Sequence, residues 1–251
     1  MTVRQNILIT GASSGLGVEM ARQFAAKGRN LALCARRIER VDELAGQLRR
    51  DNPGIRVVTR QLDVTDHDAV FAVFRDFRAE LGRIDRVIAN AGLGKGQPLG
   101  TGYFERANKQ TLETNVLGLL AQCEAAMEIF LDQRDGHLVV LASVLAERGA
   151  PRTLTAYAAS KAFAASLAEG IRLHHGRGPV KVTTLKPGYI ESEMTARAPK
   201  SPLIVSTEKG VREMVAVIER EPATAFVPRW PWAVLARLVR MAPDWLLRKV
   251  M

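Results

Sequence analysis

The chain has 251 residues, nearly half of them apolar, and a formal net charge of +10 at pH 7. This length and apolar content are enough to bury one large core, so we expect residues 1–251 to form a single domain. The basic residues are interspersed with acidic ones and do not gather with aromatic residues into a patch, so we expect no nucleic-acid partner.

The N-terminal segment predicts a strand, a glycine-rich turn and a helix in succession. Residues 6–10 form a short apolar run of strand type, and residues 18–27 follow the period of a helix. Between them, Gly11 permits a tight turn, Gly15 lets a ligand approach the backbone, and Gly17 allows the helix to pack on the sheet. Free N–H groups at the start of such a helix bind phosphate, so the segment predicts a dinucleotide site.

Six further apolar runs follow, separated by helical patterns. They cover residues 30–35, 56–62, 86–90, 137–141, 181–186 and 224–227. Helical crossovers between such strands imply a parallel sheet. The chain is therefore predicted to be an α/β protein with a doubly wound, seven-stranded parallel sheet flanked by helices.

The compartment and the absence of a metal are predicted from the same sequence. The first apolar run is too short for a signal peptide and leads directly into the glycine turn. Cys34 and Cys123 have no pairing pattern, and the four histidines have no ligand spacing. We therefore expect a cytoplasmic protein with reduced thiols and no bound metal.

A tyrosine and a lysine lie one helical turn apart, at Tyr157 and Lys161, after Ser143. Positions i and i+4 of a helix share a face, so the phenol and the ammonium group should point into the same pocket. A nearby positive charge stabilises a phenolate and lowers the pKa of a tyrosine toward neutrality. The spacing therefore predicts a tyrosine that transfers protons.

These motifs together resemble those of the classical short-chain dehydrogenase/reductases, over residues 7–192. The residues that match, in the family's order and at its separations, are Thr10-Gly-x-x-x-Gly-x-Gly17, Asn90-Ala-Gly92, Asn115, Ser143 and Tyr157-x-x-x-Lys161. The resemblance implies a Rossmann-type fold and a nicotinamide cofactor. It also implies hydride transfer between an alcohol and a ketone or aldehyde, in a homodimer or homotetramer.

The resemblance implies a catalytic set of four residues. Tyr157 would donate a proton to the substrate carbonyl oxygen, or remove one from an alcohol, and Ser143 would hydrogen-bond the same oxygen. Lys161 would lower the pKa of Tyr157 and bond the nicotinamide ribose. Asn115 would distort its helix with its side chain and hold a water molecule with its main-chain carbonyl. The cofactor supplies the hydride, so the protein needs only to position and polarise.

The end of the second predicted strand indicates which nicotinamide cofactor binds. NAD-binding folds have an acidic residue there, whereas in this chain Ala35 is followed by Arg36 and Arg37. Guanidinium groups bind a 2′-phosphate, which a carboxylate would repel. We therefore expect NADP(H).

Further cofactor contacts are implied by the resemblance. Asp63 and Val64 would contact the adenine, Asn90 would lie beside the adenosine ribose, and Ser192 stands where the family usually has threonine. The complete predicted cofactor set is Gly11, Ser13, Ser14, Gly15, Leu16, Gly17, Arg36, Arg37, Asp63, Val64, Asn90, Ala91, Gly92, Tyr157, Lys161, Pro187, Gly188, Ile190 and Ser192.

The C-terminal tail, residues 229–251, is basic and amphipathic. It contains three tryptophans and has five basic residues against one acidic residue, and Pro243 is expected to begin a second short helix. One polar stripe recurs at helical spacing, formed by Arg237, Arg240, Asp244 and Arg248. Apolar residues occupy the remaining faces: Leu235, Leu238, Val239, Ala242, Leu246 and Val250.

Three placements of this tail stay open. It can pack against a partner subunit or its own chain, lie on an anionic membrane surface as a peripheral contact, or cover an apolar substrate pocket. Its apolar residues lie on more than one face, which slightly favours a subunit contact. No apolar run in it approaches the roughly twenty residues needed to cross a bilayer.

Taken together, the residues predict an NADPH-dependent oxidoreductase that acts on an apolar or lipid-like ketone or aldehyde. The alternative is an NADP(H)-binding regulatory or scaffold protein without turnover, against which the intact set of four catalytic residues argues. The loops at residues 93–109 and 189–206 would set the substrate. The physiological substrate, stereochemistry and net direction do not follow from the sequence.

Overall fold

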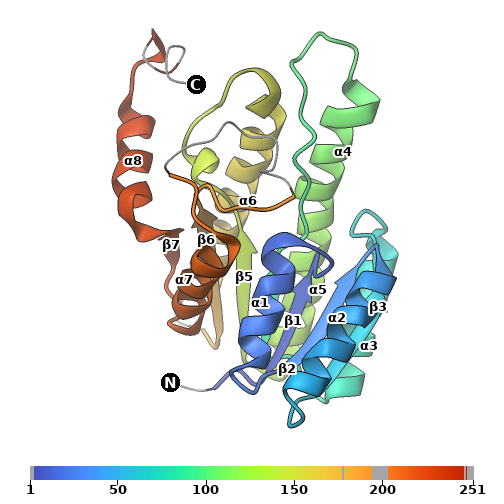
Figure 1. Ribbon diagram of the computed structural model, residues 1–251. Helices are drawn as coiled ribbons and strands as arrows, with labels where there is room; N and C mark the ends of the chain where they lie inside the picture. The colour runs from blue at the N-terminus through green and yellow to red at the C-terminus, as the bar shows by residue number, and fades with distance from the viewer. Residues whose placement is uncertain (1–2, 177, 194–202, 246, 248–251) are drawn as a thin grey trace.

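A computed structural model describes residues 3–176, 178–193, 203–245 and 247. Its centre is a seven-stranded parallel sheet in the order β3-β2-β1-β4-β5-β6-β7 (Figure 1). Every predicted strand is present, with each end within one residue of the prediction, so the predicted fold class is confirmed. The strands are β1 (Asn6–Thr10), β2 (Asn30–Ala35), β3 (Val57–Gln61), β4 (Arg86–Ala89), β5 (Gly136–Leu141), β6 (Val180–Pro187) and β7 (Thr224–Val227).

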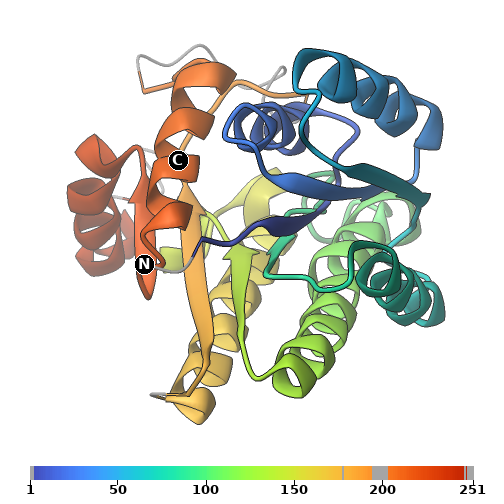
Figure 2. The ribbon, with the colours of Figure 1, turned by 90° about the horizontal axis from the view of Figure 1, so that it is seen from below.

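Helices cover both faces of the sheet (Figure 2). Side chains alternate along β1, so Ile7 and Ile9 enter one core and Leu8 enters the other. Both faces are buried, which explains why the strands are continuous apolar runs. The first core is closed by α1 (Gly15–Ala25), α2 (Ile38–Asp51) and α7 (Thr207–Glu219), and the second by α3 (His67–Leu81), α5 (Gly118–Gln133) and α6 (Thr155–His175).

The strand order reverses at β1, which pairs with β2 on one side and β4 on the other. In open α/β sheets this reversal leaves a crevice beyond the carboxyl ends of the strands, where ligands bind. A long connection from β4 leads past this crevice to α5 (Figure 1). It contains η1 (Phe104–Asn108) and η2 (Glu113–Leu117), which are π-helical, with α4 (Lys109–Leu112) between them.

A group of charged and polar residues is buried at the amino ends of the strands. Arg86 is the first residue of β4 and His137 the second of β5, and both are fully buried. Arg86 Nε donates to His137 Nδ1 at 2.8 Å, and the guanidinium lies 3.4 Å from Glu221. His137 Nε2 lies 2.8 Å from Thr183 Oγ1, which donates to the Pro222 carbonyl at 2.7 Å. Because Nδ1 accepts a hydrogen bond from Arg86, His137 is neutral and carries its proton on Nε2.

The C-terminal helix α8 (Arg229–Met241) lies beside the edge strand β7 (Figure 1). Its backbone is non-helical at Trp230, and it buries Trp232 and Ala236. A further helical turn follows Pro243. Among the described residues, no helix is both long enough and apolar enough to cross a membrane. Three residues of the C-terminal tail lie outside the described residues: Arg248 of its polar stripe, and Leu246 and Val250 of its apolar faces.

Candidate active site

The glycine-rich turn between β1 and α1 has the backbone that its sequence predicts. Gly11 and Gly15 are left-handed, with φ of +66° and +52°, a conformation that favours glycine. A Cβ on Gly17 would lie 2.4 Å from the Gly11 carbonyl oxygen, so the helix can approach the turn only with glycine there. Ser14 makes no side-chain hydrogen bond to the first turn of α1. The N–H groups of that turn can therefore receive an anion.

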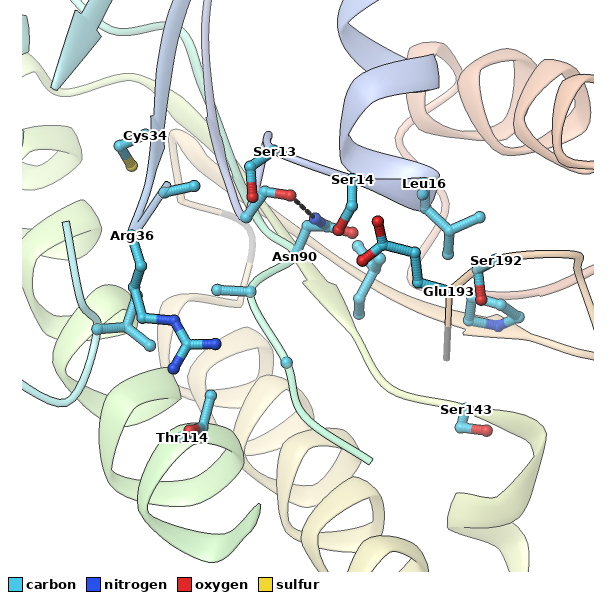
Figure 3. A pocket seen from close by; sticks show the side chains of 18 of the residues that line it. Ser13, Ser14, Leu16, Cys34, Arg36, Asn90, Thr114, Ser143, Ser192 and Glu193 are labelled. Carbon is cyan, nitrogen blue, oxygen red and sulfur yellow. Dashed lines mark hydrogen bonds between the residues drawn. The ribbon is translucent and has the colours of Figure 1, made fainter. Parts of the chain in front are cut away.

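Thr10 fixes this turn to β4 and α5. Its hydroxyl donates to Gln122 Oε1 at 2.7 Å and accepts from the backbone N–H groups of Asn90 and Ala91, both at 3.0 Å. Asn90 Nδ2 donates to the carbonyl of Thr10 at 2.8 Å. It also donates to the carbonyl of Gly11 at 3.4 Å (Figure 3). Asn90 thus holds the turn in place, and its contact with a ribose remains a prediction.

A cleft opens over the carboxyl ends of the strands, with Arg36 toward one end and Ser143 toward the other (Figure 3). Every predicted cofactor residue except Gly17 lines it, and so does every predicted catalytic residue except Asn115. Sequence reasoning missed a further set of lining residues, most of which follow or end a strand beside a predicted residue: Cys34, Ala35, Leu62, Thr114, Leu141, Ala142 and Glu193.

Basic side chains gather at the end of β2. Arg37 donates to Ser13 Oγ at 3.3 Å, and its guanidinium lies 3.4 Å from the Glu193 carboxylate. Arg40, which the sequence reading passed over, lies 3.1 Å from the same carboxylate. It lies in the first turn of α2, three residues after Arg37, and its place next to the Arg36–Arg37 pair is the signal that could have found it. Glu193 had no such signal, because it reaches the arginines from the loop after β6.

Asp63 and Val64 follow β3 at the same end of the cleft. The Asp63 carboxylate accepts from the N–H and hydroxyl of Thr65 at 3.0 and 2.9 Å, and it lies 4.0 Å from Arg36. A Cβ on Gly118 would lie 2.9 Å from Val64, so α5 packs closely beneath this turn. The structure therefore fixes both residues in the cleft wall, and their contact with an adenine remains a prediction.

At the other end, Ser143, Tyr157 and Lys161 converge. Ser143 follows β5 and begins the 3₁₀-helical turn η3 (Val144–Glu147), where its Oγ accepts from the Leu145 N–H at 3.1 Å. Tyr157 lines the same end of the cleft as Ser143. The Lys161 ammonium lies 5.8 Å from the centre of the Tyr157 ring and donates to the Leu141 carbonyl at 2.9 Å.

The protonation of this group differs from the expectation that Lys161 lowers the pKa of Tyr157. Burial raises the pKa of Tyr157 to about 12, a hydrogen bond to Ser143 lowers it in part, and Tyr189 adds to the rise. Burial lowers the pKa of Lys161 to about 8. Desolvation opposes both charged forms, and the ammonium bonds a carbonyl instead of the phenol. At neutral pH the phenol therefore carries its proton.

Asn115 lies behind the cleft wall and connects three segments. Its Nδ2 donates to the Leu93 carbonyl at 2.8 Å and to Ser160 Oγ at 3.0 Å, while its Oδ1 accepts from the Leu93 N–H at 2.7 Å. Ser160 in turn donates to the Tyr157 carbonyl at 2.7 Å. Asn115 sits within the π-helical turn η2, a local widening that often marks functional sites. The sequence reading missed Ser160, although it lies inside the Tyr157–Lys161 motif.

The C-terminal part of the chain packs against Gly188, which lines the cleft. The indole of Trp232 lies over Gly188, where a Cβ would stand 2.1 Å from its Nε1. Its ring meets that of Tyr189 edge to face, with centroids 5.3 Å apart. The sequence analysis did not predict this position of Trp232 because the contact is tertiary. Of the two predicted substrate loops, residues 194–202 lie outside the described residues.

This geometry fits a nicotinamide dinucleotide. The glycines leave room for a diphosphate at the start of α1, and the polar side chains converge at the opposite end of the cleft. Residue types and distances at both ends therefore suit a cofactor that spans the cleft.

Comparison with known proteins agrees with this geometry. A family model described as short chain dehydrogenase matches residues 5–202. The chain is 52% identical over 246 residues to an uncharacterised oxidoreductase of Mycobacterium tuberculosis, covering 98% of this chain and 97% of the relative. It is 38% identical over 194 residues to 11-beta-hydroxysteroid dehydrogenase 1A of Arabidopsis thaliana, covering 75% and 53%. A short-chain dehydrogenase from Sphingobium yanoikuyae, solved with NADPH, superposes with a TM-score of 0.81 at 27% identity, covering 97% and 95%.

Proposed function

Because the chain belongs to the short-chain dehydrogenase family, we propose that it is an NADPH-dependent oxidoreductase that interconverts a ketone or aldehyde and an alcohol. The observation that carries this proposal is the meeting of Ser143, Tyr157 and Lys161 in one cleft, with arginines at its far end. A nicotinamide cofactor bound there supplies or accepts a hydride.

The choice of NADPH rests on the charges at the end of β2. Arg36 and Arg37 line the cleft where NAD-binding folds carry an acid, and Arg40 adds a third guanidinium nearby. The negative charge of Asp63 is partly compensated, because its carboxylate accepts two hydrogen bonds from Thr65. A 2′-phosphate would meet more positive than negative charge there, and the NADPH bound in the Sphingobium enzyme agrees with this choice.

Tyr157 acts as the proton donor to the substrate oxygen. Its pKa of about 12 keeps the phenol protonated at neutral pH, which suits reduction of a carbonyl more than oxidation of an alcohol. Ser143, which lines the cleft beside Tyr157, binds the same substrate oxygen and stabilises the negative charge that develops there.

Lys161 and Asn115 support the tyrosine. Lys161, whose pKa is about 8, is mostly charged at neutral pH and stabilises the phenolate left after proton transfer. It also stands close to the backbone of Gly92, where a ribose hydroxyl would bind. Asn115 holds the backbone of Leu93 against α6 through Ser160 and so keeps the tyrosine's helix in register with the cleft.

An apolar, lipid-like substrate suits the apolar and aromatic side chains near the Ser143 end of the cleft. Val144 and Leu145 follow Ser143 directly, and Trp232 and Tyr189 form an aromatic pair beside the cleft. One relative is by name a hydroxysteroid dehydrogenase, which is consistent with an apolar carbonyl compound. We further propose that the protein is cytoplasmic, as a single domain, and assembles as a homodimer or homotetramer.

A panel of apolar ketones and aldehydes, assayed with NADPH and with NADH, tests the proposal. The proposal expects NADPH oxidation with at least one apolar ketone and a lower efficiency with NADH. A protein that binds NADPH tightly and turns over no compound in the panel would instead be the regulatory or scaffold protein that the sequence left as the alternative.

A further inference from the structure

The outer face of α8 exposes apolar side chains along its length. Val234, Leu238 and Met241 recur at spacings of four and three, so they share one face of the helix. Trp230 precedes this helical stretch and Trp245 follows it. The exposed fractions of these five residues lie between 44% and 84%. We call them the α8 stripe.

This stripe is not the side on which α8 packs against its own chain. Trp232 and Ala236, which are buried, lie on the opposite side of the helix, and Trp232 packs on Gly188 and Tyr189. The internal packing of α8 is therefore complete without the stripe. An exposed apolar face of this kind marks an interaction surface.

The charges around the stripe are positive. Arg229, Arg237 and Arg240 are exposed, and in the part of the chain that the structure describes none of them makes an ion pair. The tail's acidic residue, Asp244, points instead to Arg148, with Oδ1 2.6 Å from the guanidinium. Arg148 also donates to the main-chain carbonyl of Arg240 at 2.9 Å. The surface that faces outward is consequently apolar and cationic.

We propose that the α8 stripe docks the protein on an anionic lipid bilayer surface. Tryptophans at both ends, aliphatic residues between them and unpaired arginines alongside complement the headgroup and acyl boundary of such a bilayer. A second copy of the chain would need acidic residues opposite these arginines, and the same stripe on a twofold partner presents further arginines instead. Charge complementarity therefore favours lipid over self-association, and it reverses the slight preference for a subunit contact drawn from the sequence.

Docking through α8 also brings the cleft near the lipid. The helix lies beside η3, the turn that follows Ser143. Its carboxyl end points in the same direction as the carboxyl ends of the strands, where the cleft lies (Figure 1). A lipid-like ketone could then pass between bilayer and cleft. This consequence rests on the proposed function, whereas the docking face itself does not.

Vesicle sedimentation tests the docking face with the full-length protein alone. The probes are vesicles of phosphatidylcholine with about one third phosphatidylglycerol, and vesicles of phosphatidylcholine only, at low and high salt. We expect binding to the anionic vesicles alone, weakening as salt is raised. Leu238→Ser should reduce the affinity about tenfold and Arg237→Glu at least about fivefold.

Matched controls separate the stripe from general surface effects. Leu173→Ser changes an exposed leucine on α6, and Arg50→Glu changes an exposed arginine at the end of α2. Both should sediment like the unchanged protein, and NADPH titration should show that all four variants keep the cofactor affinity and hence the fold.

Three results would overturn the docking face: no binding to anionic vesicles, equal binding to neutral ones, or equal losses in the control variants. A protein that ignores vesicles, and whose dimer dissociates on Leu238→Ser, would assign the stripe to a second copy and also overturn it. Anionic-vesicle binding without turnover of any ketone would support the docking face and count against the reductase proposal.

Discussion

At the scale of single residues, the proposed preference for NADPH depends on the arginines after β2. A charge-assisted hydrogen bond contributes about 1.5 to 3 kcal/mol, so the unchanged protein should prefer NADPH to NADH by about tenfold or more. Arg36→Asp should narrow or reverse that preference, because a carboxylate repels the 2′-phosphate and accepts from a 2′-hydroxyl. The measurement is kcat/KM for each cofactor.

Arg75→Asp is the matched control for this change, because Arg75 is an exposed arginine on α3 that does not line the cleft. It should leave the preference as it is. Equal efficiency with both cofactors in the unchanged protein would rule out the assignment to NADPH.

Glu193 is an acidic residue that pairs with two arginines at this end of the cleft, Arg37 and Arg40. Its carboxylate lies 3.4 Å from Arg37 and 3.1 Å from Arg40, where it would repel an incoming 2′-phosphate. The groups are exposed and screened, so Glu193→Gln should tighten NADPH only about two- to fivefold and leave NADH unchanged. Fluorescence titration measures both dissociation constants.

Glu191→Gln removes an exposed carboxylate two residues earlier that lies outside the cleft lining, and it should change neither constant. If Glu193→Gln tightened NADH as much as NADPH, the carboxylate would act on a part of the cofactor other than the 2′-phosphate.

At the scale of elements, the buried contact between β4 and β5 should make stability depend on pH. Burial first, and then the charges of Arg86 and Arg4, hold the pKa of His137 well below its ordinary value, although Glu221 lies 3.5 Å away. The unfolded chain therefore binds one more proton than the folded one below about pH 6.5. Stability present at neutral pH is lost as pH falls, by up to about 1.4 kcal/mol per pH unit.

Urea unfolding from about pH 7.5 to about pH 5 measures this slope. His137→Gln should lower stability at neutral pH and remove the one-proton part of the slope. His67→Gln, which changes a histidine at the exposed start of α3, should leave the slope unchanged. The same slope in His137→Gln and the unchanged protein would mean that His137 does not cause it.

The strands and the glycine turn could be predicted because local pattern determines them. Continuous apolar runs such as Leu31 to Ala35 are buried on both faces. A positive φ favours glycine, as at Gly11. The π-helical turn η2 could be expected only from the family resemblance, because the bonds between Asn115 and Leu93 that accompany it join segments apart in sequence.

Features that depend on packing escaped the sequence in the same way. In the sequence, Trp232 does not differ from the other tryptophans of the tail, and only the structure shows it packed over Gly188. Likewise, the sequence shows His137 only as a polar residue near the start of a strand and does not indicate its bond to Arg86. The sequence led us to expect a lowered pKa for Tyr157, because the four-residue spacing places Lys161 nearby. The same spacing says nothing of the burial of the two groups, which raises the pKa of Tyr157. Spacing predicts which side chains meet, whereas desolvation depends on everything around them.

At the scale of the whole molecule, the charged residues that stabilise the fold and those that line the cleft lie at opposite ends of the strands. The amino ends of the strands bury Arg86 and His137 in a network that joins β4, β5 and β6. The carboxyl ends hold the cleft, with the arginines after β2 toward one end and Ser143 and Tyr157 toward the other. The strand reversal at β1 creates this separation, because it opens a crevice at one edge of the sheet only.

The central claim is that this cleft binds NADPH and that Tyr157 transfers a proton to the substrate. The most direct test compares Tyr157→Phe with the unchanged protein, measuring both kcat for an apolar ketone and the Kd for NADPH. Only the hydroxyl is lost, so we predict that kcat falls by about 10² to 10⁴ while the Kd stays the same. A Tyr157→Phe variant whose kcat stays within about threefold of the unchanged protein would contradict the claim.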